Sequence, residues 1–111
     1  MKSGVDADRV YIAHMLECID RVLTYTETGE AAFRQSHLIQ DAVIRNLQVM
    51  AESSQRLSES TKAKSPDTPW RAISGFRNMV VHDYLGLDLD VIWGVVSKEL
   101  PPLQKALLAI R

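Results

Sequence analysis

Four polar side chains lie close together in the stretch FRNMVVHDY, residues 76–84, and their types suit phosphate chemistry. His82 can take up or release a proton near neutral pH, because an unperturbed imidazole has a pKa of about 6.5. Arg77 stays charged and offers a planar fork for phosphate oxygens, Asn78 adds a neutral donor, and Tyr84 adds a hydroxyl or a stacking ring. Without a metal, the reaction that fits these groups is attack of an RNA 2′-hydroxyl on its own phosphate. His82 would act as base or acid, and Arg77 would stabilise the charge that develops on phosphorus.

The same residues also have a purely structural interpretation. An Arg and a His at this spacing often occur together by chance. In that case His82 would cap the carbonyls of a helix end, and Arg77 would pair with a carboxylate. Composition alone favours this structural interpretation, so the position of the residues in the fold matters.

The stretch falls on the third of four expected long helices. Thr68 is expected to cap this helix, with Pro69 at its first position and Trp70 next. A helical wheel turns Ile73, Phe76, Met79 and Val80 toward the core and Ser74, Arg77, Asn78, Val81 and His82 to the other side.

The four polar residues can line one groove on this helix. At about 100° per residue, Asn78 and His82 share one face, while Arg77 and Tyr84 are seven positions apart and nearly eclipsed. The small serine and glycine at positions 74–75 would let another helix approach closely and close the groove.

Two long helices are expected before this one. Apolar residues recur every three or four positions over residues 5–25, which predicts an amphipathic helix, and Gly29 then opens a loop. A second helix is expected from its N-cap Ser36 to about Ser58, followed by a polar loop over residues 58–69.

A final helix is expected after the motif. Asp88 or Asp90 is the expected cap, and the apolar spacing stays in phase across Pro101 and Pro102, which predicts one helix with a break or kink there. Four long helices with short connections predict an all-α bundle in one domain, residues 1–111.

Asn46 lies in the middle of the apolar stripe of the second helix. A carboxamide on a buried face must find hydrogen-bond partners. It is either a satisfied core group at a helix crossing, or a supporting group of a site at a buried interface.

Composition limits the classes of function. Thirteen Lys and Arg against 14 Asp and Glu give a net charge of -1, so nucleic-acid binding would need a local basic patch, such as one assembled across an oligomer. Cys18 is the only cysteine and cannot form an internal disulfide. No apolar run near 20 residues and no signal-like start occur, so a cytoplasmic protein with no membrane contact is expected. His14, His37 and His82 are far apart and no metal-binding motif occurs, so neither a metal nor another cofactor is expected.

The chain resembles the HepT-like branch of the HEPN superfamily over almost its whole length. HMLECIDRVLTYT and FRQSHLIQDAVIRNLQVMAES resemble the first two helices of that family, and PWRAISGFRNMVVHDYLGLDLDVIW, followed by KELPPL, resembles its signature region. The family motif is Arg, four residues, His, any residue, Tyr, which matches Arg77, His82 and Tyr84, with Asn78 as the usual polar follower. One departure is VMAESS, where Glu52 is kept but the glycine of the family's usual Gly-Glu-Ala run is not.

The resemblance implies a HEPN-type bundle of four to five helices that forms a homodimer. In such proteins the Arg–His motifs meet in a cleft at the dimer interface and cleave RNA, tRNA or mRNA, without a metal. Arg77 and His82 would then be catalytic, with Asn78 and Asn46 in support. Two copies of Arg77, together with Arg45 and Arg71, would concentrate positive potential in one groove.

The resemblance also implies a partner. Proteins of this branch are the toxins of type VII toxin–antitoxin systems, and their antitoxin is a small MNT-type nucleotidyltransferase. In several pairs it silences the toxin by transferring AMP onto the motif tyrosine, here Tyr84. The alternative is a non-catalytic HEPN module that keeps the dimer and the partner enzyme; the intact motif favours the enzyme.

Overall fold

The computed structural model describes the backbone of residues 4–82 and 88–111 and the side chains of residues 7–78 and 88–111. Within these ranges the chain is helical and contains no strand, which confirms the all-α bundle. Four long helical runs are present, as expected, together with two short helices. The elements are α1 (Gly4–Tyr25), α2 (Glu30–Gln35), α3 (His37–Gln55), α4 (Glu59–Lys62), α5 (Trp70–His82), α6 (Leu89–Gly94), the π-helical turn η1 (Val95–Glu99) and α7 (Leu100–Ile110).

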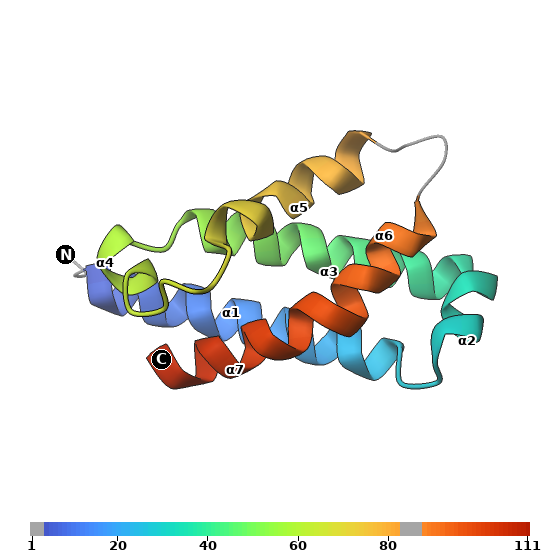
Figure 1. The fold of residues 1–111 in the computed structure, drawn as a ribbon, viewed down its shortest axis with the longest axis horizontal. Helices are drawn as coiled ribbons and strands as arrows, with labels where there is room; N and C mark the ends of the chain where they lie inside the picture. Colours follow the sequence, from blue (N-terminus) through green and yellow to red (C-terminus); the bar gives the residue numbers. More distant parts are fainter. Residues whose placement is uncertain (1–3, 83–87) are drawn as a thin grey trace.

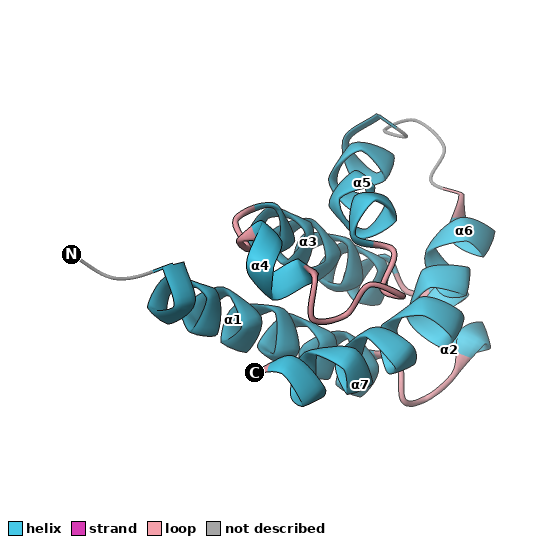
Figure 2. Cartoon of the chain, turned by 60° about the vertical axis from the view of Figure 1, so that its left-hand side comes forward, coloured by secondary structure: helices cyan, strands magenta, loops and turns pink. Residues whose placement is uncertain are grey.

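The helices form an elongated bundle with principal extents of 45 × 26 × 25 Å. Helices α1 and α3 lie side by side along its length, α7 packs against α1, and α5 packs against α3 (Figure 1). The turned view of Figure 2 shows α5 at the edge of the bundle, so one side of it remains open to solvent. Within the described ranges, no helix has the length and apolar character that a bilayer span requires.

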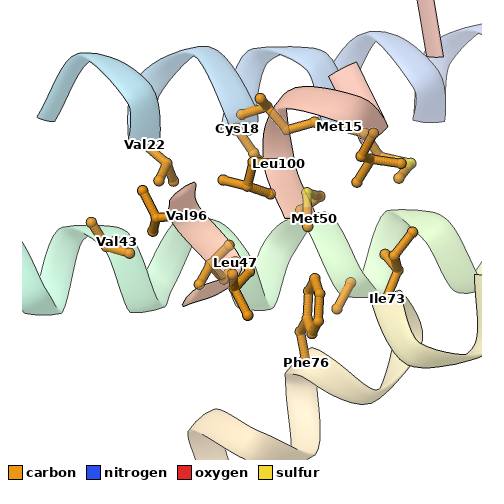
Figure 3. Packing of buried hydrophobic residues seen from close by; sticks show 14 of the residues in the cluster. Met15, Cys18, Val22, Val43, Leu47, Met50, Ile73, Phe76, Val96 and Leu100 are labelled. Atoms are coloured by element: carbon orange, nitrogen blue, oxygen red, sulfur yellow. The ribbon is translucent and has the colours of Figure 1, made fainter. Parts of the chain in front are cut away.

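The core forms where the apolar stripes of α1, α3, α5 and the final helical run meet (Figure 3). Each buried Leu, Ile, Met or Phe side chain there contributes roughly 1.5–3 kcal/mol relative to exposure. The largest fully buried side chains are Phe33, Met15, Ile19, Leu47, Met50, Leu100, Leu107, Val22 and Val43.

The helix caps largely follow the sequence. Ser36 accepts a hydrogen bond from the Ile39 N–H at 3.1 Å, and Asp88 accepts from the N–H groups of Asp90 and Val91, so both predicted caps are confirmed. Helix α3, the second of the predicted long helices, ends at Gln55, earlier than the predicted end near Ser58.

The start of α5 differs from the prediction. Its first helical hydrogen bond runs from the Ile73 N–H to the Pro69 carbonyl at 3.0 Å, so Pro69 is the residue before the helix and Trp70 the first within it. The hydroxyl of Thr68, the predicted cap, lies 2.5 Å from the Ser65 hydroxyl and holds the preceding turn.

The predicted break near Pro101 and Pro102 is present as the π-helical turn η1, directly before the prolines. Proline has no N–H, so the carbonyls four residues earlier lose their α-helical partners. The helical turn contains one extra residue here, so the Leu100 N–H donates to the Val95 carbonyl, five residues earlier instead of four. The helical run continues with its apolar residues in phase.

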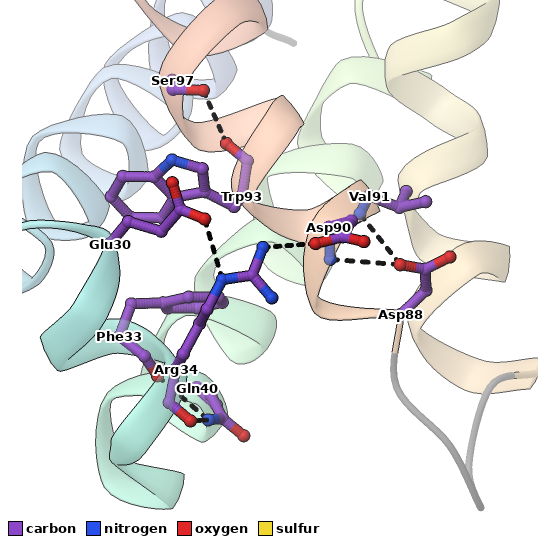
Figure 4. Close-up of polar contacts among 9 residues, drawn as sticks. All are labelled: Glu30, Phe33, Arg34, Gln40, Asp88, Asp90, Val91, Trp93 and Ser97. Atoms are coloured by element: carbon purple, nitrogen blue, oxygen red, sulfur yellow. Dashed lines mark hydrogen bonds and ion pairs between the residues drawn. The ribbon is translucent and has the colours of Figure 1, made fainter.

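A short helix, α2, stands where the sequence predicts only a loop after Gly29. Its Phe33 is fully buried and packs on Trp93, with ring centroids 5.4 Å apart. Arg34 bonds Glu30 at 2.8 Å within the helix and also bonds Asp90 of α6 (Figure 4). These contacts to distant residues stabilise a helix too short to form alone.

The predicted polar loop over residues 58–69 also contains a helix, α4. Ser58 caps it by accepting from the Thr61 N–H at 3.3 Å. Asp8 of α1 accepts from the Ser58 N–H at 3.0 Å and from the hydroxyls of Ser58 and Thr61 at 2.5 Å each. Burial raises the pKa of Asp8, but these hydrogen bonds outweigh it and hold the pKa below its ordinary value.

Candidate functional site

Helix α5 has a buried face and an exposed face, as the helical wheel predicts. Ile73 and Phe76 are 3% and 8% exposed and point into the core beside Leu47 and Met50 (Figure 3). Arg77 and Asn78, the next residues along the helix, are exposed. The core contacts therefore fix the orientation of α5, and this orientation turns Arg77 and Asn78 outward.

Arg77 pairs with Glu52 of α3. The distance from Arg77 Nε to Glu52 Oε1 is 3.8 Å, which is an ion pair and too long for a hydrogen bond. Both side chains are about half exposed, at 51% and 46%, so water screens the attraction. This contact is the carboxylate pairing of the structural interpretation, but it engages the inner nitrogen of the guanidinium. The two outer nitrogens of the guanidinium, Nη1 and Nη2, make no hydrogen bond or ion pair with the described side chains. They can therefore bind a phosphate.

Polar contacts hold α5 on α3 next to this pair. The hydroxyls of Ser54 and Ser74 lie 3.3 Å apart, and the Gln55 amide donates to the Ser74 carbonyl at 3.4 Å. Ser54 is fully buried and also donates to the Ala51 carbonyl at 2.7 Å. Ser74 is one helical turn before Arg77, so these contacts fix the position of the arginine on the bundle.

The first residue of α5 is also held. The Trp70 indole N–H is 3.1 Å from the carbonyl oxygens of both Lys62 and Ser65, so it ties the α4–α5 connection to the helix. This contact and the packing of Trp93 on Phe33 show that both tryptophans hold neighbouring elements together.

The other two motif residues are only partly placed. His82 is the last residue of α5, and its side chain lies outside the described residues, as does the whole of Tyr84. The α5 backbone carries His82 five residues beyond Arg77, about 7.5 Å along the helix axis.

Asn46, the second predicted supporting residue, is half-buried, and its amide donates to the Ala42 carbonyl of its own helix at 2.8 Å. None of the described contacts joins Asn46 to Arg77. Arg45 lies seven residues before Glu52, so the two project from the same side of α3, about 10 Å apart along the axis. Arg45 is exposed there.

The face of α5 around Gly75 is open. A Cβ atom built on Gly75 would meet nothing within 4 Å. Arg71, one turn earlier, is exposed and forms no ion pair with any described residue. The outward face of α5 thus carries small and cationic residues with no covering element from the described part of the chain.

Sequence reasoning missed the role of Glu52. The residue lies outside the apolar stripe of α3, and its partner is 25 positions away on another helix, so local spacing gives no sign of the pair. The one available signal is its place in the VMAESS stretch, where it is retained while the neighbouring glycine is not.

The remaining predicted features are placed as follows. Cys18 is buried in α1, and burial raises the pKa of its thiol. His14 and His37 are exposed on α1 and at the start of α3. Among the side chains that the structure describes, which exclude His82, no three His, Cys, Asp or Glu residues gather as metal ligands.

Comparison with known proteins matches residues 15–110 to the family described as "Ribonuclease HepT-like". A protein of Methanocaldococcus jannaschii named "Gamma-glutamylcyclotransferase and putative RNase" is 33% identical over 103 residues, which are 92% of this chain and 46% of that protein. The chain thus spans less than half the length of that relative. A "Probable ribonuclease HepT" of Thermococcus cleftensis is 30% identical over 95 residues, 85% of this chain and 86% of the relative. A second Methanocaldococcus jannaschii protein, named "Putative RNase", is 29% identical over 98 residues, 87% and 90% of the two chains. No solved structure matches.

Proposed function

The chain belongs to the HepT-like ribonuclease family, and we propose that it is a metal-independent ribonuclease whose site is built on Arg77 and His82. The observation that carries this proposal is the half-exposed guanidinium of Arg77 on the outward face of α5. A structural arginine would be expected to satisfy its fork within the fold. Among the residues that the structure describes, only Nε of Arg77 approaches a carboxylate, at 3.8 Å.

The proposed reaction is an internal transesterification. His82 removes the proton from the 2′-hydroxyl, the 2′-oxygen bonds to phosphorus, and the bond to the 5′-oxygen breaks. The leaving 5′-oxygen takes up a proton, and the products carry a 2′,3′-cyclic phosphate and a 5′-hydroxyl. Proton transfer of this kind contributes typically 10²- to 10⁴-fold to the rate. Arg77 donates to the non-bridging oxygens, where negative charge grows in the transition state.

Glu52 would act as a positioning residue in this scheme. A carboxylate that holds Nε would leave the two outer guanidinium nitrogens of Arg77 available to a phosphate. Since Glu52 and Arg77 cancel in charge, further cations are needed to attract RNA. Arg45 and Arg71 are exposed and can supply them.

We propose that the active form is a homodimer with the two motifs facing each other. The open face around Gly75 supports this arrangement, because a helix of a second copy can approach it closely. Two facing motifs would supply two histidines, one as base and one as acid, and two copies of Arg77 in one cleft.

The proposed cellular role is that of a type VII toxin, cutting tRNA or mRNA until a partner silences it. The partner would be an MNT-type nucleotidyltransferase. The Tyr84 oxygen would attack the α-phosphorus of ATP and lose its proton, and pyrophosphate would leave, so that AMP remains on the tyrosine. The added phosphate would occupy the fork of Arg77 in place of RNA.

Induction in a bacterial host without the partner tests the proposal. The wild type should arrest growth and cleave cellular RNA, while His82→Ala, at equal abundance, should do neither. Lys105→Ala, an exposed cation on α7, serves as the matched control and should behave as the wild type. If the wild type and His82→Ala are equally harmless, the chain is a non-catalytic binding module instead.

A further inference from the structure

A hollow lies on the outward face of α5, one turn before the Arg77 site. It has a volume of about 370 Å³ and lies between α4 and the first two turns of α5. Its lining residues are Glu59, Lys62, Trp70, Arg71 and Ser74.

The hollow carries one more positive than negative charge. The stem of Lys62 is largely buried, with 17% of the side chain exposed, which restricts its ammonium group to this region. Its only described carboxylate partner is Glu59, at 3.7 Å, and Glu59 is 93% exposed, so the attraction between them is weak. Arg71 is exposed with no ion pair among the described residues. Two cations that are poorly neutralised within the fold thus line one concave surface.

The walls of the hollow are rigidly connected. Trp70 is hydrogen bonded through its indole N–H to the carbonyls of Lys62 and Ser65, so α4 and α5 hold a fixed spacing. On the other side, the Ser74 hydroxyl is held by Ser54 of α3. A ligand that enters here meets a surface already in place, which lowers the entropy loss on binding.

The hollow lies beside the Arg77 site, because Ser74, which lines it, is one helical turn before Arg77. Ser74 lies three residues before Arg77, and Arg71 six residues before it, which is about 9 Å along the axis. A single strand of RNA carries one phosphate per nucleotide, so a strand that places one phosphate at Arg77 can place another over this hollow.

We propose that Lys62 and Arg71 form a phosphate-binding subsite that holds the RNA strand beside the scissile phosphate. The inference rests on the proposed ribonuclease function and adds a named substrate class to it: single-stranded RNA with at least one further phosphate on the Arg71 side. The chain has a net charge of -1, which does not by itself attract RNA. The subsite would provide the positive potential locally.

Binding of a short fluorescein-labelled single-stranded RNA tests the subsite independently of catalysis. The full-length His82→Ala protein serves as the non-cleaving parent, and affinity is measured over a series of salt concentrations. Lys62→Gln and Arg71→Gln keep much of each stem and remove its charge. Each should weaken binding about fivefold near 0.1 M salt and lower the slope of log affinity against log salt by about 0.7, the value for one single-strand phosphate contact. Lys105→Gln, the matched loss of an exposed cation on α7, should change neither.

Glu59→Gln should change the RNA affinity in the opposite direction. Removal of this carboxylate frees Lys62, so binding should tighten, while Glu27→Gln, an exposed acid outside the hollow, should have no effect. Thermal unfolding of each variant verifies that α4 remains folded.

The outcomes separate the two proposals. If the wild type cleaves RNA but Lys62→Gln and Arg71→Gln bind it as Lys105→Gln does, the subsite is refuted and the ribonuclease stands. If the slopes fall as stated while the wild type cleaves nothing, the subsite stands and the ribonuclease is refuted. No RNA binding by the parent overturns the subsite. Loss of the nucleotidyltransferase complex with unchanged RNA binding also overturns it and marks a protein contact.

Discussion

Neighbouring residues of α5 should separate function from stability. Phe76 and Arg77 are adjacent in the chain but project about 100° apart around the helix, so Phe76 is buried in the core and Arg77 is half exposed to solvent. Phe76→Ala should therefore impair the fold and Arg77→Ala only the chemistry.

The magnitudes follow from the two environments. The Arg77–Glu52 pair, at 3.8 Å and about half exposed, has a Coulomb energy of about 1 kcal/mol in water. Ordering both side chains offsets part of this energy, which leaves roughly 0.2–1 kcal/mol. Arg77→Ala should thus lower Tm by no more than about 5 °C in a domain of this size. Phe76→Ala removes a buried ring and should lower the free energy of unfolding by about 3–5 kcal/mol.

The assay combines thermal unfolding by circular dichroism with RNA cleavage well below the lower Tm. Arg77→Ala should unfold nearly as the wild type does and cleave no RNA, while Phe76→Ala should show a large drop in Tm. If Arg77→Ala destabilises as much as Phe76→Ala, Arg77 is a structural residue. If Arg77→Ala is stable and still cleaves at the wild-type rate, Arg77 has no part in the reaction.

Three further predictions concern other parts of the molecule. Asp8→Asn should lower the free energy of unfolding near neutral pH by about 1 kcal/mol. Because the folded pKa of Asp8 lies below its ordinary value of 3.8, this contribution is fully present above that value and is lost as pH falls through the folded pKa. Acid titration of stability should therefore be steeper in the wild type than in the variant, and equal slopes would count against the hydrogen-bonded carboxylate. The wild type should be a homodimer by light scattering at micromolar concentration, and Gly75→Gln should weaken the dimer while keeping its helical signal; a monomeric wild type contradicts this. Tyr84→Phe should stay at least partly toxic and gain no AMP from the partner enzyme and ATP, and intact-mass analysis that maps AMP to another residue would exclude this route of control.

The long helices could be predicted from the sequence because their stability depends on local spacing and on one apolar stripe each. The apolar spacing predicts a helix over residues 5–25, and α1 runs from Gly4 to Tyr25. The break before Pro101 was also predictable, since the missing N–H is a property of proline itself. Its form is a π-helical turn, and the residues Val96 before the prolines and Leu103 after them are both buried in the core.

The short helices could not be predicted, because distant residues stabilise them. Helix α4 depends on Asp8, which is 50 residues from Ser58 in the chain. Helix α2 depends on Asp90 and Trp93 of the final helical run. Polar composition around α4 indicates a loop, and the tertiary hydrogen bonds to Asp8, together with the Ser58 cap, reverse that preference.

In the candidate site too, features that depend on local spacing could be predicted and features that depend on helix packing could not. The outward position of Arg77 and Asn78 could be predicted from the wheel, since it depends only on which residues of α5 are apolar. The pairing with Glu52 and the hollow at Lys62 could not, because both lie between helices whose relative position depends on packing. His82 and Tyr84 stay predictions of the motif.

The most direct measurement is cleavage of a defined single-stranded RNA by the purified protein with EDTA present, with the ends of the products analysed. The wild type should cleave and leave 2′,3′-cyclic phosphate and 5′-hydroxyl ends, while His82→Ala at equal concentration and with the same helical signal should leave the RNA intact. Full loss of wild-type cleavage on EDTA treatment, or equal cleavage by His82→Ala, would contradict a metal-independent ribonuclease built on Arg77 and His82.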